Sequence, residues 1–268
     1  MKSRTIASPG DDDHDRLAVL IDADNAQPSV IEGLLAEVAK FGIASVKRIY
    51  GDFTSPQQSQ WKKALLTHSI NPVQQFAYTS GKNATDSSLI IDAMDLMYTR
   101  RFHGFCLVSS DSDFTRLAQR LREEGLIVYG FGERKTPDAF VQACDKFIYT
   151  EVLRPEAVAP APANAAAPAA KRRSSGKPST KAPAQPALPP PPFELIRQAI
   201  EDASDEHGWA QLGAVGTYLT KLRPDFDPRL HGHKKLSDLL RHHPTHFTID
   251  ERGPAGSPNK NLFVRTRE

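Results

Sequence analysis

The sequence predicts an α/β fold in which helices cover both faces of a parallel sheet. Residues 17–153 alternate short apolar runs with segments whose apolar residues recur at helical spacing, which is typical of such sheets. The first run, Leu17 to Ile21, is apolar throughout, as expected of a strand buried on both faces. Two acids follow it, Asp22 and Asp24, and open α/β sheets bind ligands at the carboxyl ends of their strands.

The other helices and strands of this unit follow from the spacing of their apolar residues. The first helix begins at Pro28 and stops near Gly42, and each crossover between parallel strands is expected to be right-handed. The expected helices cover residues 28–41, 56–68, 86–99, 114–124 and 137–143, and the further strands cover residues 43–50, 72–76, 105–108, 126–131 and 147–149.

A second strand also ends in polar residues. The apolar run from Phe105 to Val108 leads into Ser109 and Ser110, and then into Asp111 and Asp113. In extended chain, residues two apart share a face, so the two acids can point into one space. Like charges this close need protons or a metal ion to neutralise them, and oxygen-only ligand sets suit Mg²⁺ or Mn²⁺.

Both acidic stretches also fit a purely structural interpretation. Asp24 or Asn25 can cap the helix that follows the first strand, and Asp113 can cap the helix that begins near Phe114. We favour a functional site because stability alone gives no reason to gather like charges at one edge of a sheet.

Composition narrows the class of protein. The two cysteines, Cys106 and Cys144, lie in apolar surroundings without metal-like or redox-like spacing, so we expect buried, reduced thiols. No apolar run reaches membrane-spanning length, and residues 1–15 lack a signal-peptide core and form an expected disordered tail. These features together predict a cytoplasmic protein that does not bind membranes.

The charge is unevenly distributed along the chain. Residues 1–153 hold 17 Lys and Arg against 20 Asp and Glu, residues 154–192 hold 6 against 1, and residues 193–268 hold 11 of each. Residues 154–192 are dominated by Ala and Pro and cannot bury enough apolar area to fold. We expect a semi-extended basic linker that attracts nucleic-acid phosphates and raises the local concentration of substrate at the acidic site.

Residues 193–268 form a second unit. Apolar spacing indicates three helices, near residues 193–200, 212–219 and 236–240, followed by strands at 247–249 and 262–264, which is the pattern of a winged helix-turn-helix. The clustered histidines lack a cysteine or acid to complete a zinc site. Aromatic residues make up 8% of the chain and mostly lie in apolar patterns, so no platform for single-stranded nucleic acid is evident. The candidate phosphate contacts of this unit are basic residues, namely Lys234, Lys235, Lys260 and Arg265.

Four motifs in order carry a resemblance to a known family. They are Leu20-Ile-Asp-Ala-Asp-Asn25, Lys82-Asn-Ala-Thr-Asp86 with Asp92 six residues later, Val108-Ser-Ser-Asp-Ser-Asp-Phe114, and Val128-Tyr-Gly-Phe-Gly-Glu133. With these motifs residues 16–153 resemble the NYN domain, a branch of the PIN-like nuclease superfamily that includes LabA-like proteins, with a Rossmann-like parallel sheet. Residues 193–268 resemble the OST-HTH/LOTUS domain, through Gly232-His-Lys-Lys-Leu-Ser-Asp-Leu-Leu240.

The resemblance implies a Mg²⁺- or Mn²⁺-dependent endoribonuclease. By position, the catalytic and metal-binding acids are Asp22, Asp86, Asp111 and Asp113. Asn25, Asp24, Ser109, Ser110 and Asp92 are assigned supporting roles, and Lys82 is assigned a phosphate contact. Asp92 is assigned a supporting role because it lies about 240° around the helix from Asp86, so the two side chains need not face the same cavity. The implied partner is RNA, single-stranded or structured.

Three alternatives remain open at this point. Asp22-Ala-Asp24 is similar to the first motif of haloacid-dehalogenase-type phosphatases, but the later lysine and acidic pair of that family fit poorly. The first unit can instead be a catalytically weak or inactive domain of an RNA-binding regulatory protein. A winged helix can also bind DNA. The sequence specifies neither the RNA nor an oligomeric state.

Overall fold

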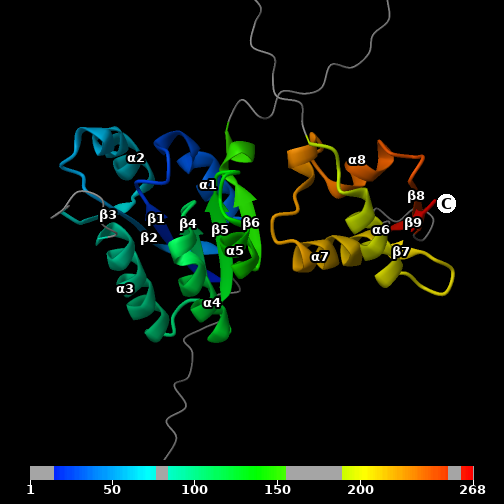
Figure 1. Cartoon of the computed structure of the whole chain (residues 1–268), viewed down its shortest axis with the longest axis horizontal. Helices are drawn as coiled ribbons and strands as arrows, with labels where there is room; N and C mark the ends of the chain where they lie inside the picture. The colour runs from blue at the N-terminus through cyan, green and yellow to red at the C-terminus, as the bar shows by residue number, and fades with distance from the viewer. Residues whose placement is uncertain (1–14, 77–83, 155–188, 253–260, 268) are drawn as a thin grey trace, which may run out of the picture.

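The first unit is a six-stranded parallel sheet covered by helices on both faces, as predicted. The computed structural model describes residues 15–76, 84–154, 189–252 and 261–267. The strand order is β3-β2-β1-β4-β5-β6, and all neighbouring strands are parallel (Figure 1). The strands are β1 (Arg16–Asp22), β2 (Ile43–Gly51), β3 (Asn71–Gln74), β4 (Gly104–Val108), β5 (Ile127–Gly132) and β6 (Lys146–Tyr149).

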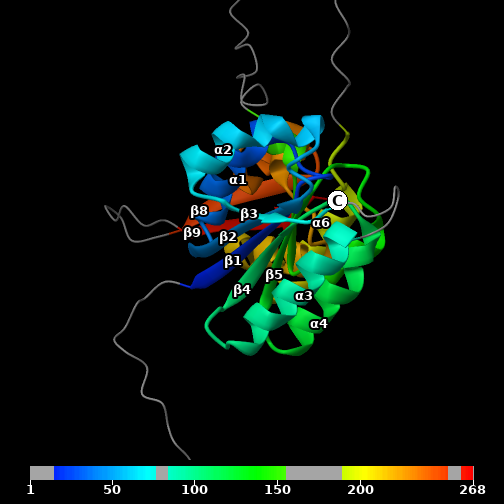
Figure 2. The same cartoon turned by 90° about the vertical axis from the view of Figure 1, so that its left-hand side faces the viewer.

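The position of strand β1 between two hydrophobic cores explains why its sequence is apolar throughout. Ala18 and Leu20 belong to one hydrophobic core, whereas Leu17, Val19 and Ile21 belong to the other. Successive side chains of a strand point to opposite faces, so a strand between two cores needs apolar residues at every position. Helices α1 (Ile31–Val38) and α2 (Trp61–His68) cover one face, and α3 (Ala84–Tyr98), α4 (Thr115–Glu123) and α5 (Asp138–Ala143) cover the other (Figure 2).

Most differences from prediction in the first unit lie at the ends of helices and strands. The helix expected over residues 56–68 begins as a 3₁₀ turn at Pro56–Gln60 before α2, and the helix expected from Phe114 is preceded by a 3₁₀ turn at Ser112–Phe114. Tight turns of this kind are frequent at helix starts. Helix α3 begins at Ala84, two residues earlier than expected, which places Asp86 in its first turn. Both cysteines are buried free thiols, as predicted.

The second unit combines three helices with a small antiparallel sheet. Its helices are α6 (Phe193–Asp202), α7 (Leu212–Leu222) and α8 (Leu236–Arg241), and its strands are β7 (Ala210–Gln211), β8 (Phe247–Arg252) and β9 (Asn261–Thr266). The sheet order is β7-β9-β8, so the predicted hairpin acquires a third strand. Strand β7 was not expected, because two residues are too few to show a period of two.

The two units contact each other at the free edge of β6. The Phe147 backbone N–H donates to the Pro224 carbonyl at 2.8 Å, and the Tyr149 hydroxyl donates to Asp225 at 3.0 Å. Arg229 of the second unit donates to both carboxylate oxygens of Glu37 on α1, at 2.9 and 3.2 Å. The predicted tail and nearly all of the predicted linker lie outside the described residues. In the parts of the chain that the structure describes, no helix is long and apolar enough to cross a membrane.

Candidate functional site

The carboxyl ends of β1 and β4 meet at the point where the strand order reverses. Strand β1 pairs with β2 on one side and with β4 on the other. The chain therefore leaves β1 and β4 toward opposite faces of the sheet. Open α/β sheets bind ligands at this point of the fold. Asp22 ends β1, and Ser109 follows directly after β4.

Three of the predicted acids come together near the point where the strand order reverses. One carboxylate oxygen each of Asp86, Asp111 and Asp113 lies within 4.8 Å of the other two. Asp86 comes from the first turn of α3, whereas Asp111 and Asp113 come from the turn after β4. A capping hydrogen bond is present at this turn, but Asp111 makes it, not Asp113 as was predicted. The Oδ1 atom of Asp111 accepts from the Asp113 backbone N–H at 2.9 Å.

The crowding of these acids changes how one of them titrates. Burial is the first cause that raises the pKa of Asp86 to about 6, and repulsion from the neighbouring carboxylates, led by Asp22, adds to it. A carboxyl group in this position binds either a proton or a cation. The three carboxylates offer only oxygen ligands, which are the donors that Mg²⁺ and Mn²⁺ prefer.

Asp22 lies next to this acidic cluster but is completely buried. Its Oδ2 accepts from Ser109 Oγ at 2.8 Å and from Asn25 Nδ2 at 2.7 Å, and its Oδ1 accepts from the Asp24 backbone N–H at 3.0 Å. Burial raises the pKa of Asp22, and the hydrogen bonds from Ser109 and Asn25 act in the opposite direction. A side chain with no exposed surface is poorly placed to attack a phosphate, which weighs against the phosphatase alternative.

Asp24 and Asn25 do not cap the next turn. The 3₁₀ turn that precedes α1 begins after Gln27, with no side-chain capping bond. Instead, Asp24 is exposed and accepts from Gln58 Nε2 at 2.8 Å, while Asn25 bonds to Asp22. Gln58 is 7% exposed and also donates to the Ala23 carbonyl at 3.3 Å. Sequence reasoning missed Gln58, because nothing distinguishes it from the other polar residues of its segment.

The loop after β5 supports the strand ends from the other side. Ser110 Oγ accepts from the Glu133 backbone N–H at 2.8 Å, and the Ser109 backbone N–H donates to the Phe131 carbonyl at 2.9 Å. A Cβ on Gly132 would lie 2.6 Å from the Ser109 carbonyl oxygen, so only glycine permits this approach. The glycine-rich motif of β5 therefore serves to hold Ser109 and Ser110 in place.

The remaining candidates are spread over the molecule. Asp92 lies outside the acidic cluster and accepts hydrogen bonds from Arg48 and Tyr50 of β2. Lys234, Lys235 and Arg265 are exposed on the second unit. Lys82 and Lys260 lie outside the described residues.

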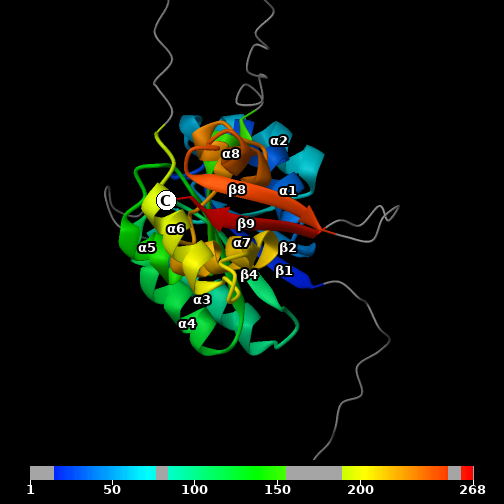
Figure 3. The same cartoon turned by 90° about the vertical axis from the view of Figure 1, so that its right-hand side faces the viewer.

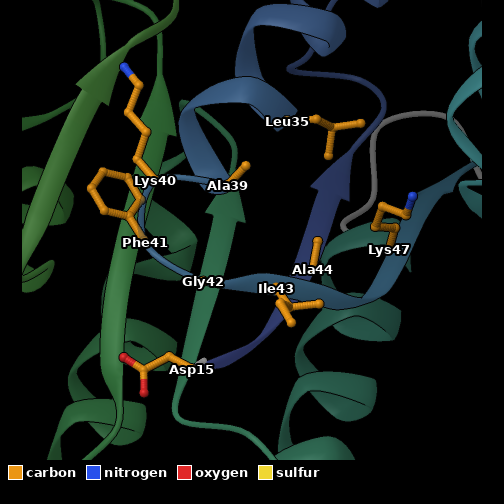
Figure 4. A pocket seen from close by; sticks show the side chains of 9 residues that line it. All are labelled: Asp15, Leu35, Ala39, Lys40, Phe41, Gly42, Ile43, Ala44 and Lys47. Atoms are coloured by element: carbon orange, nitrogen blue, oxygen red, sulfur yellow. The ribbon is translucent and has the colours of Figure 1, made fainter. Parts of the chain in front are cut away.

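A depression at the opposite end of the sheet is separate from these acids. It has a volume of about 740 Å³ and lies at the start of β1 and β2, beside Asp15 and Gly42 (Figure 4). The ammonium groups of its two lysines already have acceptors, since Lys40 pairs with Glu37 at 2.8 Å and Lys47 donates to the His68 carbonyl at 2.5 Å. It therefore lacks the free charge that would bind a phosphate.

Comparison with protein families identifies both units. The NYN domain model matches residues 16–152, and the OST-HTH/LOTUS domain model matches residues 191–258. The chain belongs to the NYN domain family and carries a C-terminal OST-HTH/LOTUS domain. It thus combines a nuclease-like domain with an RNA-binding module.

Three solved structures show partial similarity. An uncharacterised protein from Nitrosomonas europaea is 41% identical over 37% of this chain and 93% of its own, with a TM-score of 0.29. A protein of unknown function from Vibrio parahaemolyticus is 20% identical over 53% and 96%, with a TM-score of 0.44. A fragment (175–257) of a Chromobacterium violaceum protein is 34% identical over 30% and 84%, with a TM-score of 0.24. No match was found among the curated proteins.

Proposed function

We propose that this protein is a Mg²⁺- or Mn²⁺-dependent endoribonuclease that its LOTUS domain recruits to RNA. The observation that carries the proposal is the cluster of Asp86, Asp111 and Asp113, whose oxygens lie within 4.8 Å of one another at the strand crossover of a nuclease-like domain. Such a cluster destabilises the domain at neutral pH unless protons or a cation neutralise it, so stability alone does not explain it.

The chain's own residues divide the work. Asp86, Asp111 and Asp113 would hold the metal. The buried Asp22 beside them would add its charge, and Ser109 and Asn25 fix the orientation of the Asp22 carboxylate. When bound, a divalent cation neutralises charge that develops on phosphate oxygens and lowers the pKa of water. Ser109 also accepts from the Asp111 backbone N–H at 3.1 Å, so it orients an acid from each of the two strands.

We further propose that the protein acts in the cytoplasm. Both cysteines are buried free thiols, in keeping with a reducing compartment.

Cleavage of a labelled single-stranded RNA tests the function. The wild-type chain is incubated with Mg²⁺ or Mn²⁺ or with EDTA, beside Asp111→Asn and the matched control Asp95→Asn. Asp95 lies on the exposed side of α3, so its change removes the same charge without altering the acidic cluster. We expect internal cutting by the wild type and by Asp95→Asn, and a loss of at least about 100-fold in Asp111→Asn.

Two results would contradict the proposal. Equal cutting by Asp111→Asn would show that the acidic cluster is not the site. Undetectable cutting of several RNAs and DNAs, with RNA binding intact, would instead identify the protein as a catalytically inactive RNA-binding regulator.

A further inference from the structure

The small sheet of the LOTUS domain has an outer face that the proposed nuclease site does not use. Alternation along the strands places Phe247 and Val264 in the domain core, so the residues beside them point outward. The hairpin β8–β9 lies on the side of this domain that is turned away from the NYN unit (Figures 1 and 3). The outward side chains of the sheet and its preceding turn are Trp209, Gln211, Thr248, Asp250, Arg252, Phe263, Arg265 and Arg267.

Arginine and aromatic side chains are layered on this face. The guanidinium carbon of Arg252 lies 4.6 Å from the ring centre of Trp209 and 4.7 Å from that of Phe263. The guanidinium carbon of Arg265 lies 5.0 Å from the ring centre of Trp209. The Arg252 side chain nonetheless remains 41% exposed, and Arg265 is exposed. Guanidinium groups that lie over aromatic rings and stay partly exposed can still contact a further planar group.

The turn that carries Trp209 is fixed before any ligand arrives. Asp205 Oδ1 accepts from the backbone N–H groups of His207 and Trp209, each at 2.9 Å. Gly208 adopts a φ of 73°, which favours glycine, and the aliphatic part of Arg265 packs close to it. A bridge between Ser204 and Ala210 closes the turn. The aromatic ring is therefore presented in one position, which lowers the entropy lost on binding.

The charge of the face favours an anionic ligand. Arg252, Arg265 and Arg267 outnumber the two acids beside them. These are Asp250, whose carboxylate pairs with Arg252 at 2.9 Å, and Asp205 of the turn, which also interacts electrostatically with Arg252. Alternating cationic and aromatic planes suit a chain that carries both phosphates and flat bases. Single-stranded RNA offers both, whereas a duplex hides its bases in the stack.

We infer that Trp209, Arg252, Phe263 and Arg265 form a stacking platform for the unpaired bases of single-stranded RNA. The inference deepens the proposed function, on which it rests for RNA as the ligand, but it does not require that the acidic site cuts RNA. The aromatic content of the sequence did not indicate this platform, because the fold brings its parts together. Trp209 and Phe263 are 54 positions apart and become neighbours through the pairing of β7 with β9.

Binding of the full chain to a short fluorescent RNA tests the platform. The double variant Arg252→Lys with Arg265→Lys keeps both charges but removes the planar groups. The matched control is Arg241→Lys: Arg241, like Arg252, is a half-exposed arginine paired with an acid of β8, but it is not among the arginines that lie over an aromatic ring. A second ligand, an abasic strand of equal length, keeps the phosphates and lacks the bases. Circular dichroism and thermal unfolding verify that each variant is folded.

We expect the double variant to bind the RNA at least about 5-fold more weakly, which is the lower limit for one stacked base. It should bind the abasic strand as well as the wild type does, and its salt dependence should be unchanged because the charge is kept. Arg241→Lys should match the wild type on both ligands. Equal RNA binding by all variants would overturn the platform and leave RNA recruitment intact. A wild type that binds no RNA would overturn both.

Discussion

Burial and the neighbouring carboxylates together alter the titration of Asp86. Its pKa of about 6 in the folded protein lies above its ordinary value of 3.8, so the folded protein holds a proton at pH values where the unfolded chain has lost it. The stability that this group contributes is present below about pH 4 and is lost as the pH rises through about 6. Above that range the metal-free protein carries the full repulsion of its acidic cluster.

Asp86→Asn should therefore stabilise the metal-free protein in alkaline solution. At pH 8 in EDTA we expect its free energy of unfolding to exceed that of the wild type by on the order of 1 kcal/mol, a value reduced from the full pKa shift because the side chain is partly exposed. The difference should shrink toward pH 4. Urea unfolding at both pH values measures it, with Asp95→Asn as control; a gain that does not depend on pH would contradict the assignment of the raised pKa.

Asp92 links helix α3 to the sheet, in addition to the apolar residues of the helix that pack in the core. Asp92 accepts hydrogen bonds from Arg48 and Tyr50 of β2, and the Tyr50 side chain is completely buried. The hydrogen bond to Asp92 is the first cause that raises the pKa of Arg48, and burial is the first that raises the pKa of Tyr50. This ties the helix to the sheet six residues after Asp86. Asp92 thus positions an acid of the site without joining it.

Asp92→Ala should destabilise the protein by about 2–3 kcal/mol, because it leaves an arginine and a buried hydroxyl without their acceptor. Asp95→Ala, three residues further along the same helix and exposed, should change the stability by less than about 0.5 kcal/mol. Urea unfolding compares the two. If both substitutions lower the free energy of unfolding by the same amount, Asp92 does not anchor the helix.

An arginine supplies one of the ion pairs between the two units. Arg229 joins Glu37 of the NYN unit to Asp227 of its own unit, and Lys40 supplies a further bond to Glu37. Burial by itself raises the pKa of Glu37, but the hydrogen bonds from Arg229 and Lys40 outweigh it and hold that pKa below its ordinary value of 4.5. The stabilisation from Glu37 is therefore present above about pH 4.5 and is lost as the pH falls through its lowered pKa. The two units are joined by this contact as well as by their linker.

Arg229→Met should release the LOTUS domain from the NYN domain. Removing one partner of a largely buried ion pair typically costs about 3–5 kcal/mol, whereas the other contacts between the units are hydrogen bonds and the exposed ion pair of Arg223 with Asp138. Small-angle X-ray scattering at pH 7.5 should show a larger radius of gyration for this variant than for the wild type. Arg241→Met removes an ion pair within the LOTUS domain and should scatter like the wild type. Identical profiles for all three proteins would show that Arg229 does not hold the units together.

Local patterns predicted the sheet and where its acids lie. The apolar run of β1 reports burial on both faces, and the acids after β1 and β4 mark strand ends that any parallel sheet brings to one edge. These features are readable because strand and helix periods are properties of neighbouring residues. The class of fold and the approximate ends of most helices and strands followed from them, and the family followed from the resemblance of four motifs.

Packing decided which distant side chains became partners. The bonds of Gln58 to Asp24, of Arg48 to Asp92 and of Arg229 to Glu37 join residues 34, 44 and 192 positions apart. The layered outer face of the LOTUS sheet likewise depends on the register of β7 against β9. A period in the sequence states which face of a strand or helix is buried, but not what it is buried against. What a face is buried against depends on the register and packing of the whole chain. The same packing leaves Asp86, Asp111 and Asp113 clustered together and encloses Asp22.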